Sequence, residues 1–243
     1  MGRQSIDWAR RRRLLFYAGA GGSNPYVPSD TDGLRLALDY RSGVIESGGL
    51  VSQWTDLSGN DNHFTQATTA NKPTLAVDGV AFDGIDDFVD IANLLSAGGS
   101  SARTLFIKAR AVTVDAGGIF AINDQQAGTG NARSWNLTPE IAMRVAGFEL
   151  YDAALSTSNY EIITIRNPTS GDISSLQAWV NGSELGVSGG GGTDGFNVQG
   201  TVSAIGRSAI NYGNIRYKAI WFYNVEKNNT ERAALEAEMA LIP

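Results

Sequence analysis

Two turn segments of the chain carry carboxylate and amide side chains of the kind that hard cations accept. The first segment holds Asp56, Asn60 and Asp61, and the second holds Asp86 and Asp87. Calcium takes about six to eight oxygen ligands of these types. The spacing differs from an EF-hand, because the glycine and the distal glutamate of that motif are missing after Asp56. A calcium site is therefore one expectation, and the alternative is that these side chains only stabilise their turns.

Two aromatic residues lie in polar segments, where a ring is available to a ligand. Trp135 is in the polar segment 123–139, and Tyr212 is in the segment 211–214. An exposed aromatic ring offers an apolar face on which a sugar can pack, and neighbouring aspartate and asparagine side chains can bind its hydroxyl groups. We therefore expect a possible glycan site at Trp135 or Tyr212. The alternative is that both rings cap an edge of the fold.

The residue sets of the common catalytic centres are missing from the sequence. It has no cysteine and one histidine, His63, which excludes thiolate chemistry and multi-histidine metal sites. Glycoside hydrolysis needs two carboxyl groups that flank the bond, and Glu161 has no second acid in its expected strand. The glycine-rich segments also lack the lysine or the strand–helix context of phosphate-binding loops. From these observations we predict that the protein is not an enzyme.

The charge is divided between a basic N-terminal segment and an acidic remainder. The 243 residues have a formal net charge of −6, yet five of the 19 basic residues and only one of the 25 acidic residues lie in residues 1–13. An acidic body repels nucleic acid, so we expect no nucleic-acid partner for it. We predict a partner-binding arm formed by Arg3, Trp8, Arg10, Arg11, Arg12, Arg13, Leu14, Leu15, Phe16 and Tyr17.

The composition of this arm indicates what would hold it. Arginine forks bind carboxylates through two hydrogen bonds, so an acidic neighbouring subunit is the expected partner. The alternative is an arm folded back on its own body. The apolar stretch 14–20 is only seven residues long and continues into glycine-rich sequence, unlike a secretory signal with its cleavage site. Nor does the sequence contain the apolar run of about 18 residues that a transmembrane helix needs, so we expect no membrane partner.

Turn signals at short intervals separate segments of alternating hydrophobicity. Residues 18–33 are rich in Gly, Pro, Ser, Asn and Asp, which predicts an arm and linker over 1–33 and a folded body over 34–243. Only residues 230–241 have the composition of a helix, with Thr230 as its expected cap. Many short strands with one terminal helix predict an all-β sandwich or jelly roll. Strands are expected over 34–40, 51–54, 80–82, 88–91, 104–112, 118–122, 141–145, 148–151, 160–166, 176–180, 202–205 and 215–223.

Three segments in order carry a resemblance to a known family. They are SQWTDLSGNDNH over 52–63, KPTL over 72–75 and FDGIDDFV over 82–89. With LQAWVNG over 176–182 and the closing strand and helix over 220–239, they are similar to the laminin-G-like, concanavalin A-like jelly-roll domains of phage and bacterial surface proteins. The resemblance covers about residues 34–242. It implies a jelly-roll β-sandwich, with calcium carried by many members at varying positions.

The resemblance and the arm together imply a function. We expect a non-catalytic structural or adhesion subunit of a large assembly, namely a tailed-phage virion protein of the decoration, collar or fibre type. Its arm would bind other virion subunits, and it would occur as a homo-oligomer within the particle. The alternative is a lectin-like carbohydrate-binding module that recognises surface glycans. The virion is the expected location, and a secreted or cell-surface location is the alternative.

Replacing Arg10, Arg11, Arg12 and Arg13 with alanine is expected to weaken association with the particle. The wild-type attraction is electrostatic and should fall as salt rises, whereas the variant should respond little to salt. Co-sedimentation with particles measures this, and deletion of residues 1–17 should abolish association while the body stays folded. Full association of the four-alanine variant would refute an electrostatic anchor.

Overall fold

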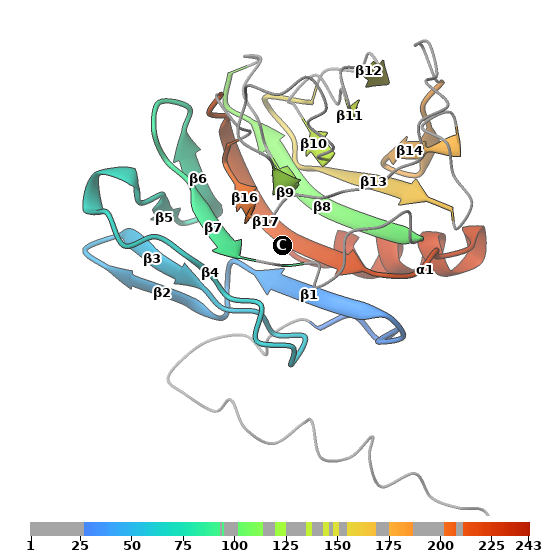
Figure 1. Ribbon diagram of the computed structural model, residues 1–243, viewed down its shortest axis with the longest axis horizontal. Helices are drawn as coiled ribbons and strands as arrows, with labels where there is room; N and C mark the ends of the chain where they lie inside the picture. Colours follow the sequence, from blue (N-terminus) through green and yellow to red (C-terminus); the bar gives the residue numbers. More distant parts are fainter. Residues whose placement is uncertain are drawn as a thin grey trace, which may run out of the picture.

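The structure is a computed structural model that describes residues 27–92, 94, 102–113, 120–124, 135–137, 143–145, 148–150, 155–168, 175–186, 202–207 and 211–243. Within these ranges the chain forms seventeen strands, one short 3-10 helix, η2 (Thr69–Asn71), and one α-helix, α1 (Asn229–Ala240) (Figure 1). The strands are β1 (Leu34–Asp39), β2 (Val44–Ser47), β3 (Leu50–Trp54), β4 (Phe64–Thr65), β5 (Thr74–Ala76), β6 (Gly79–Asp83), β7 (Val89–Ala92), β8 (Arg103–Ala111), β9 (Phe120–Asp124), β10 (Trp135–Leu137), β11 (Met143–Val145), β12 (Phe148–Leu150), β13 (Glu161–Asn167), β14 (Gln177–Val180), β15 (Ser183–Glu184), β16 (Val202–Ile205) and β17 (Asn214–Tyr223).

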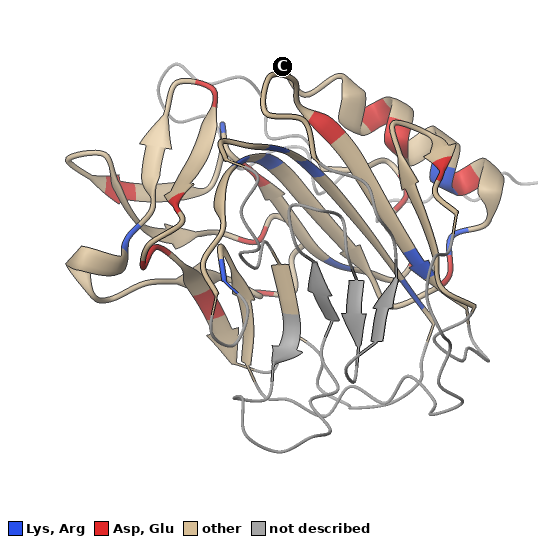
Figure 2. Cartoon of the chain, turned by 90° about the horizontal axis from the view of Figure 1, so that it is seen from above, with Lys and Arg blue, Asp and Glu red and all other residues tan. Residues whose placement is uncertain are grey.

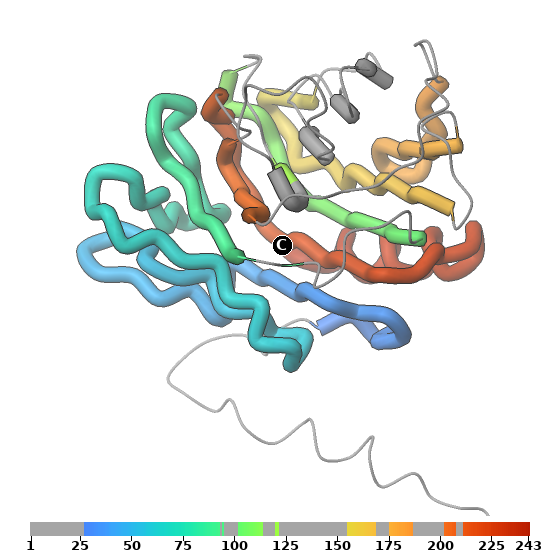
Figure 3. The backbone as a smooth tube through the Cα atoms, in the orientation of Figure 1, coloured from blue at the N-terminus to red at the C-terminus, as the bar shows by residue number. Residues whose placement is uncertain are grey.

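The strands form two antiparallel layers. The pairing order of the first layer is β1–β17–β8–β13–β14–β15. The order of the second is β2–β3–β4–β7–β16–β9–β10–β11–β12. Strands β5 and β6 join the layers, because β5 pairs with β3 and β6 pairs with the beginning of β17 (Figure 3). The prediction of an all-β fold with a C-terminal helix is confirmed.

Strand β17 shows why the sequence folds this way. Its first half alternates between buried and half-buried residues, and its second half is buried throughout. Ile220 and Phe222 belong to the large core between the layers, whereas Trp221 and Tyr223 belong to a second core under α1. A strand that is apolar on both faces needs a covering layer on each face. The strand expected over 215–223 is therefore present, and it is covered on both faces.

Aromatic rings fix the centre of the large core. The Tyr217 ring meets the Phe82 ring edge to face at 5.3 Å between centroids, and it meets the Trp54 ring at 6.4 Å. Edge-to-face pairs of this kind add to the free energy gained from burial. The indole N–H of Trp54 donates to the carbonyl of Asp39 at 3.2 Å, so the buried nitrogen is satisfied. Trp54 is thus a fully buried residue of the core between the layers.

Helix α1 begins at Asn229, before the residue predicted to cap it, and its cap is two residues earlier than predicted. Asn228 is the N-cap, and its side chain accepts from the backbone N–H groups of Thr230 and Glu231. The Glu231 carboxylate accepts a hydrogen bond from the backbone N–H of Asn228, which completes a capping box. Asn and Thr both cap helices, and here the reciprocal glutamate lies three residues after the asparagine. The prediction of Thr230 as the cap is therefore wrong.

The end of α1 is held by a buried lysine from the sheet below it. The Lys108 ammonium donates to the carbonyls of Met239 at 3.3 Å, Ala240 at 3.0 Å and Ile242 at 2.5 Å. The Met239 carbonyl also accepts from the N–H of Ile242 at 3.2 Å, and a cation near a helix C-terminus is favourable. Lys108 therefore fixes how far α1 extends across the outer face of the first layer.

The segment 27–33 lies against the same helix. The Ser29 hydroxyl and N–H both donate to the carboxylate of Glu238. The Lys227 ammonium donates to Asp30 at 2.7 Å, and the Tyr223 hydroxyl donates to the carbonyl of Asp30 at 3.0 Å. The last residues before β1 are thus tied to the helix side of the sandwich. Among the described residues, no helix has the length and apolar character needed to cross a membrane.

Candidate functional site

Two turns that are distant in sequence meet at one rim of the sandwich. Strand β6 ends at Asp83, which pairs with Asn214 at the start of β17. Strand β7 begins at Val89, which pairs with Ile205 at the end of β16. The turn 84–88 therefore lies beside residues 206–207 and 211–214. We call residues 83–90, 206–207 and 211–214 the β6–β7 rim.

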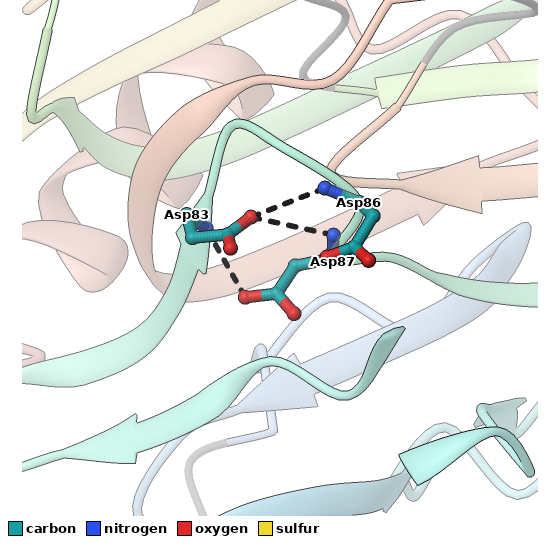
Figure 4. Close-up of side chains that lie close together, drawn as sticks. All are labelled: Asp83, Asp86 and Asp87. Carbon is teal, nitrogen blue, oxygen red and sulfur yellow. Dashed lines mark hydrogen bonds between the residues drawn. The ribbon is translucent and has the colours of Figure 1, made fainter. Parts of the chain in front are cut away.

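The turn is organised by one carboxylate. Asp83 Oδ1 accepts from the N–H groups of Ile85 at 2.8 Å, Asp86 at 3.3 Å and Asp87 at 3.4 Å (Figure 4). Gly84 has φ +77°, and a Cβ there would lie 2.8 Å from the Cβ of Asn214. A side chain at this position would therefore be strained and crowded. The F-D-G-x-D-D segment forms this turn because the aspartate supplies the acceptor and the glycine supplies the backbone conformation.

Asp87 is the perturbed group of the turn. Its side chain is buried, and its Oδ2 accepts from the N–H of Asp83 at 3.1 Å. Burial raises the pKa of Asp87 to about 6, and the negative charges of Asp83 and Asp86 also raise it, although the hydrogen bond from the Asp83 backbone opposes them. A carboxyl group with a raised pKa keeps its proton to a higher pH than an aspartate in the unfolded chain does.

These three carboxylates are the part of the predicted calcium set that the fold brings together. One oxygen each from Asp83, Asp86 and Asp87 lies within 4.8 Å of the others (Figure 4). The predicted calcium set does not include Asp83, because an Asp-Gly pair in a sequence indicates a turn and not a metal ligand. Asp83 Oδ2, Asp87 Oδ1 and both Asp86 oxygens take no hydrogen bond from the described residues. These oxygens fit part of a calcium shell, so calcium binding stays a prediction for this turn.

The other calcium candidates lie elsewhere and are committed to the fold. Asp56 is buried, and its Oδ1 accepts from the N–H groups of Ala37 at 2.9 Å and Ser58 at 2.8 Å. Its Oδ2 accepts from the Ser58 hydroxyl at 2.7 Å and from the N–H of Asn62 at 3.1 Å. The carboxylate therefore joins β1 to the loop after β3. Asp56 therefore stabilises its turn, which is the alternative to calcium binding given in the sequence analysis.

The remaining polar residues of this loop have local roles as well. The Asn60 amide donates to the carbonyl of Leu34 at 3.0 Å. Asp61 has φ +59°, and its side chain is 92% exposed. His63 Nδ1 accepts from the N–H of Asp56 at 3.1 Å, so the single histidine supports the same loop. The other acid considered for catalysis, Glu161, accepts from the N–H of Ser156 at 2.7 Å.

An aromatic pair lies beside the acidic turn. The rings of Phe88 and Tyr212 are 6.3 Å apart and tilted by 47°, and both residues are half-buried. The Arg207 guanidinium lies 3.9 Å from the centre of the Phe88 ring and binds Asp90 at 3.1 Å. Arg207 and Tyr212 also form a backbone bridge. Tyr212, which the sequence analysis predicts as a glycan-binding residue, thus belongs to a cluster with Phe88, Asp90 and Arg207. The sequence analysis did not identify these three residues.

The backbone at this rim is shaped by Gly206. Its φ is +88°, and a Cβ there would lie 2.2 Å from Cδ1 of the buried Phe82 ring. Only glycine allows the chain to pass so close to the core and then present Arg207.

The other predicted site residues do not join the rim. In β10, Trp135 pairs with Ile122 of β9, and Leu137 pairs with Phe120 of the same strand. Phe120 in turn pairs with Ile205 at the end of β16, so Leu137 and not Trp135 lies at the level of Ile205. Trp135 and Tyr212 therefore lie at different levels of the sandwich. The arm residues Arg3 to Tyr17 lie outside the described residues, so the assembly role, its partners and the virion location stay predictions.

Comparison with known proteins identifies the fold but no family. No family model matches the sequence, and no curated protein matches it. A sialidase of Trypanosoma rangeli is similar in structure, with a TM-score of 0.60 and 14% identity over 86% of this chain and 33% of that one. A GH54 α-L-arabinofuranosidase matches with a TM-score of 0.55 and 13% identity over 78% and 50% of the two chains. Botulinum neurotoxin type C matches with a TM-score of 0.53 and 10% identity over 86% and 52%.

These similarities correct one prediction. The expectation that the protein is not an enzyme is wrong, because solved structures that share its sandwich are themselves sialidases and an arabinofuranosidase. The absence of one glucanase-type carboxylate string therefore does not exclude catalysis on this fold. At these identities the likeness shows the fold alone. The chain spans about a third of the length of the sialidases that it matches.

Replacement of Asp56 by asparagine is expected to lower the free energy of unfolding by about 2 kcal/mol. The amide cannot replace a carboxylate that accepts four hydrogen bonds from buried donors. Urea denaturation measures the change. Asp61→Asn is the matched control, since it removes the same charge from an exposed side chain and should change stability by less than about 0.5 kcal/mol. Equal effects of the two substitutions would contradict the assigned role of Asp56.

The stability of the protein should depend on pH through Asp87. Its pKa is about 6 in the folded protein and 3.8 in the unfolded chain, so the folded state holds more protons between these values. Its stabilising contribution is complete below pH 3.8 and is lost as pH rises through about 6.

Asp87→Asn should remove this loss and raise stability near neutral pH relative to wild type. Chemical denaturation between about pH 4 and pH 7 measures the difference, with Asp61→Asn as control. An unchanged pH dependence in Asp87→Asn would show that Asp87 is not the titrating group.

Proposed function

We propose that the chain is a concanavalin A-like sandwich domain that binds glycans at the β6–β7 rim. The observation that carries the proposal is the half-buried pair of Phe88 and Tyr212 rings, which lie beside charged hydrogen-bonding groups at the turn end of the sandwich. An apolar ring face next to a few fixed polar groups is the usual composition of a small-ligand site.

Each part of the rim has a role in this proposal. The aromatic pair would pack against the C–H face of a sugar ring. Asp90 and Asp86 would accept hydrogen bonds from sugar hydroxyl groups, and Arg207 would donate to sugar oxygens. Arg207 is held in place by the Phe88 ring and the Asp90 carboxylate, so little side-chain entropy is lost when it binds. Ile85 is 73% exposed at the tip of the turn and adds apolar surface.

The similar structures support a sugar ligand. Their descriptions name a sialidase in complex with sialic acid, an arabinofuranosidase, and a neurotoxin whose cell entry depends on two ganglioside molecules. All three descriptions concern carbohydrate or a carbohydrate-bearing lipid. Together with the resemblance of segments 52–63 and 82–89 to concanavalin A-like domains, they favour the carbohydrate-binding alternative of the sequence analysis.

Tyr212→Ala is expected to weaken glycan binding by about tenfold, which corresponds to the loss of one aromatic contact. A glycan array with the full chain identifies ligands, and calorimetry of wild type and variant with the strongest ligand measures the change. Tyr212→Phe is the matched control, because it keeps the ring and should retain most of the affinity. Equal binding by the alanine variant would show that sugars do not contact this rim, and absence of any ligand for wild type would overturn the proposal.

Cleavage of a glycosidic bond is a second candidate function. It is favoured by Asp87, whose pKa is raised to about 6 and whose carboxyl group lies close to those of Asp83 and Asp86. Glycosidases use such a pair, in which one carboxyl group holds the proton and the other is ionised.

The second function predicts release of reducing sugar from an array ligand by wild type and loss of release in Asp87→Asn. The substitution should leave binding within about twofold of wild type, since the amide keeps the shape of the buried side chain and leaves the aromatic pair of the rim unchanged. No release by wild type would exclude cleavage of that ligand, while binding alone would still support the first proposal.

A further inference from the structure

A second surface lies on the outer face of the first layer, beyond the C-terminus of α1. Arg110 on β8 pairs directly with Arg216 on β17, and Lys108 pairs with Ala219 next to Lys218. A bulge in β17 between Tyr217 and Ala219 allows Lys218 to lie on this face. Figure 2 shows Lys and Arg positions on the long strands of this layer and several Asp and Glu positions along the helix. We define the basic face as Arg41, Lys108, Arg110, Arg216 and Lys218.

The positive charges of the basic face exceed the negative charges that neutralise them. Asp78 binds Arg216 at 2.6 Å and Arg110 at 3.5 Å, and Asp39 binds Arg41 at 2.6 Å. The Lys108 ammonium is occupied by the carbonyls at the end of α1. Among the described residues, these ion pairs join two carboxylates to three of the five cations, although the whole chain has a net charge of −6.

Lys218 is the cation of this face whose ammonium is bound neither by a carboxylate nor by a helix end. Its ammonium lies 4.1 Å from the centre of the Tyr160 ring, and in the described part of the chain it forms no ion pair and no hydrogen bond. The Tyr160 hydroxyl donates to the carbonyl of Asp78 at 2.6 Å, which fixes the ring under the lysine. Burial lowers the pKa of Lys218, and Arg110 and Arg41 lower it further while Asp78 opposes them. An anion placed over Lys218 would relieve this repulsion.

We infer that the basic face binds the carboxylate groups of an acidic polysaccharide, with Lys218 as the main contact. This inference rests on the proposed function and adds a ligand class to it. The charge density of the ligand supports the choice. An acidic body repels a densely charged polymer such as nucleic acid, whereas a glycan with one carboxylate per sugar presents few charges to the rest of the surface. Cations already cover the Tyr160 ring, so the contacts would be ionic and not stacking.

The experiment compares two polymers that differ only in charge, using the full chain. Polygalacturonate carries a carboxylate on each sugar, and its fully methyl-esterified form has the same backbone without charge. At about 50 mM salt we expect polygalacturonate to bind about tenfold more tightly than the ester, and the difference should shrink as salt rises. Lys218→Gln should reduce this preference at least threefold, by analogy with the loss of one screened ion pair of about 0.7 kcal/mol.

Arg35→Gln is the matched control. Arg35 is an exposed cation on β1, near the opposite end of β17, and its loss removes the same charge. The Arg35→Gln variant should prefer polygalacturonate over the ester by the same factor as wild type does. An equal effect of Arg35→Gln and Lys218→Gln would show that net charge and not the basic face sets the preference, which would overturn the inference.

The remaining outcomes separate this inference from the proposed function. Equal binding of the charged and esterified polymers, with both lost in Tyr212→Ala, would overturn the inference and support the rim. Binding of polygalacturonate that survives Tyr212→Ala and is lost in Lys218→Gln would support the inference and count against the rim. Polyglutamate that binds as tightly as polygalacturonate, with the same sensitivity to Lys218→Gln, would identify an acidic protein as the ligand and overturn the glycan assignment.

Discussion

The strands β8 and β17 are apolar on both faces, and the rest of the molecule is arranged to cover them. The second layer covers one face through the core that contains Tyr217 and Phe222. Helix α1 covers the other face, where its Leu235 and Met239 share a core with Trp221 of β17. The helix is too short to cover the whole outer face, so beyond its end the strands carry polar and charged residues. The buried Lys108 marks that boundary, because its ammonium donates to carbonyls in the last turn of the helix and just after it.

The same constraint places functional groups at the rim and not inside the sandwich. Side chains fill the described part of the core between the layers, and ligand-binding groups are common in turns and on uncovered faces. At the β6–β7 rim, Gly84 and Gly206 let the backbone approach its neighbours closely, and the polar side chains are then presented at fixed positions. The Asp83 carboxylate orders one turn and the Phe88 ring holds Arg207 beside it. A rigid scaffold thus supports a small, chemically mixed surface.

Much of the fold follows from local patterns in the sequence, and much of the site does not. Alternation and double burial in segment 215–223 and the turn at Asn181, with φ +50°, both follow from residue type. The short strands β4 and β15 have two residues each and leave too little pattern to detect. The pairing of Phe88 with Tyr212 depends on the register of β6 and β17, which no local pattern specifies. The carboxylates of Asp56 and Asp87 look alike in sequence, and only burial and hydrogen bonding separate their roles.

The central claim is that sugars contact the β6–β7 rim, and chemical-shift mapping tests it most directly. The full chain, labelled with nitrogen-15, would be titrated with the oligosaccharide that binds most tightly on an array. The account predicts that the largest amide shifts fall in residues 83–90 and 206–214, with smaller changes across the strands behind them. Shifts concentrated around residues 135–137, or spread without a centre, would contradict the assignment of the rim.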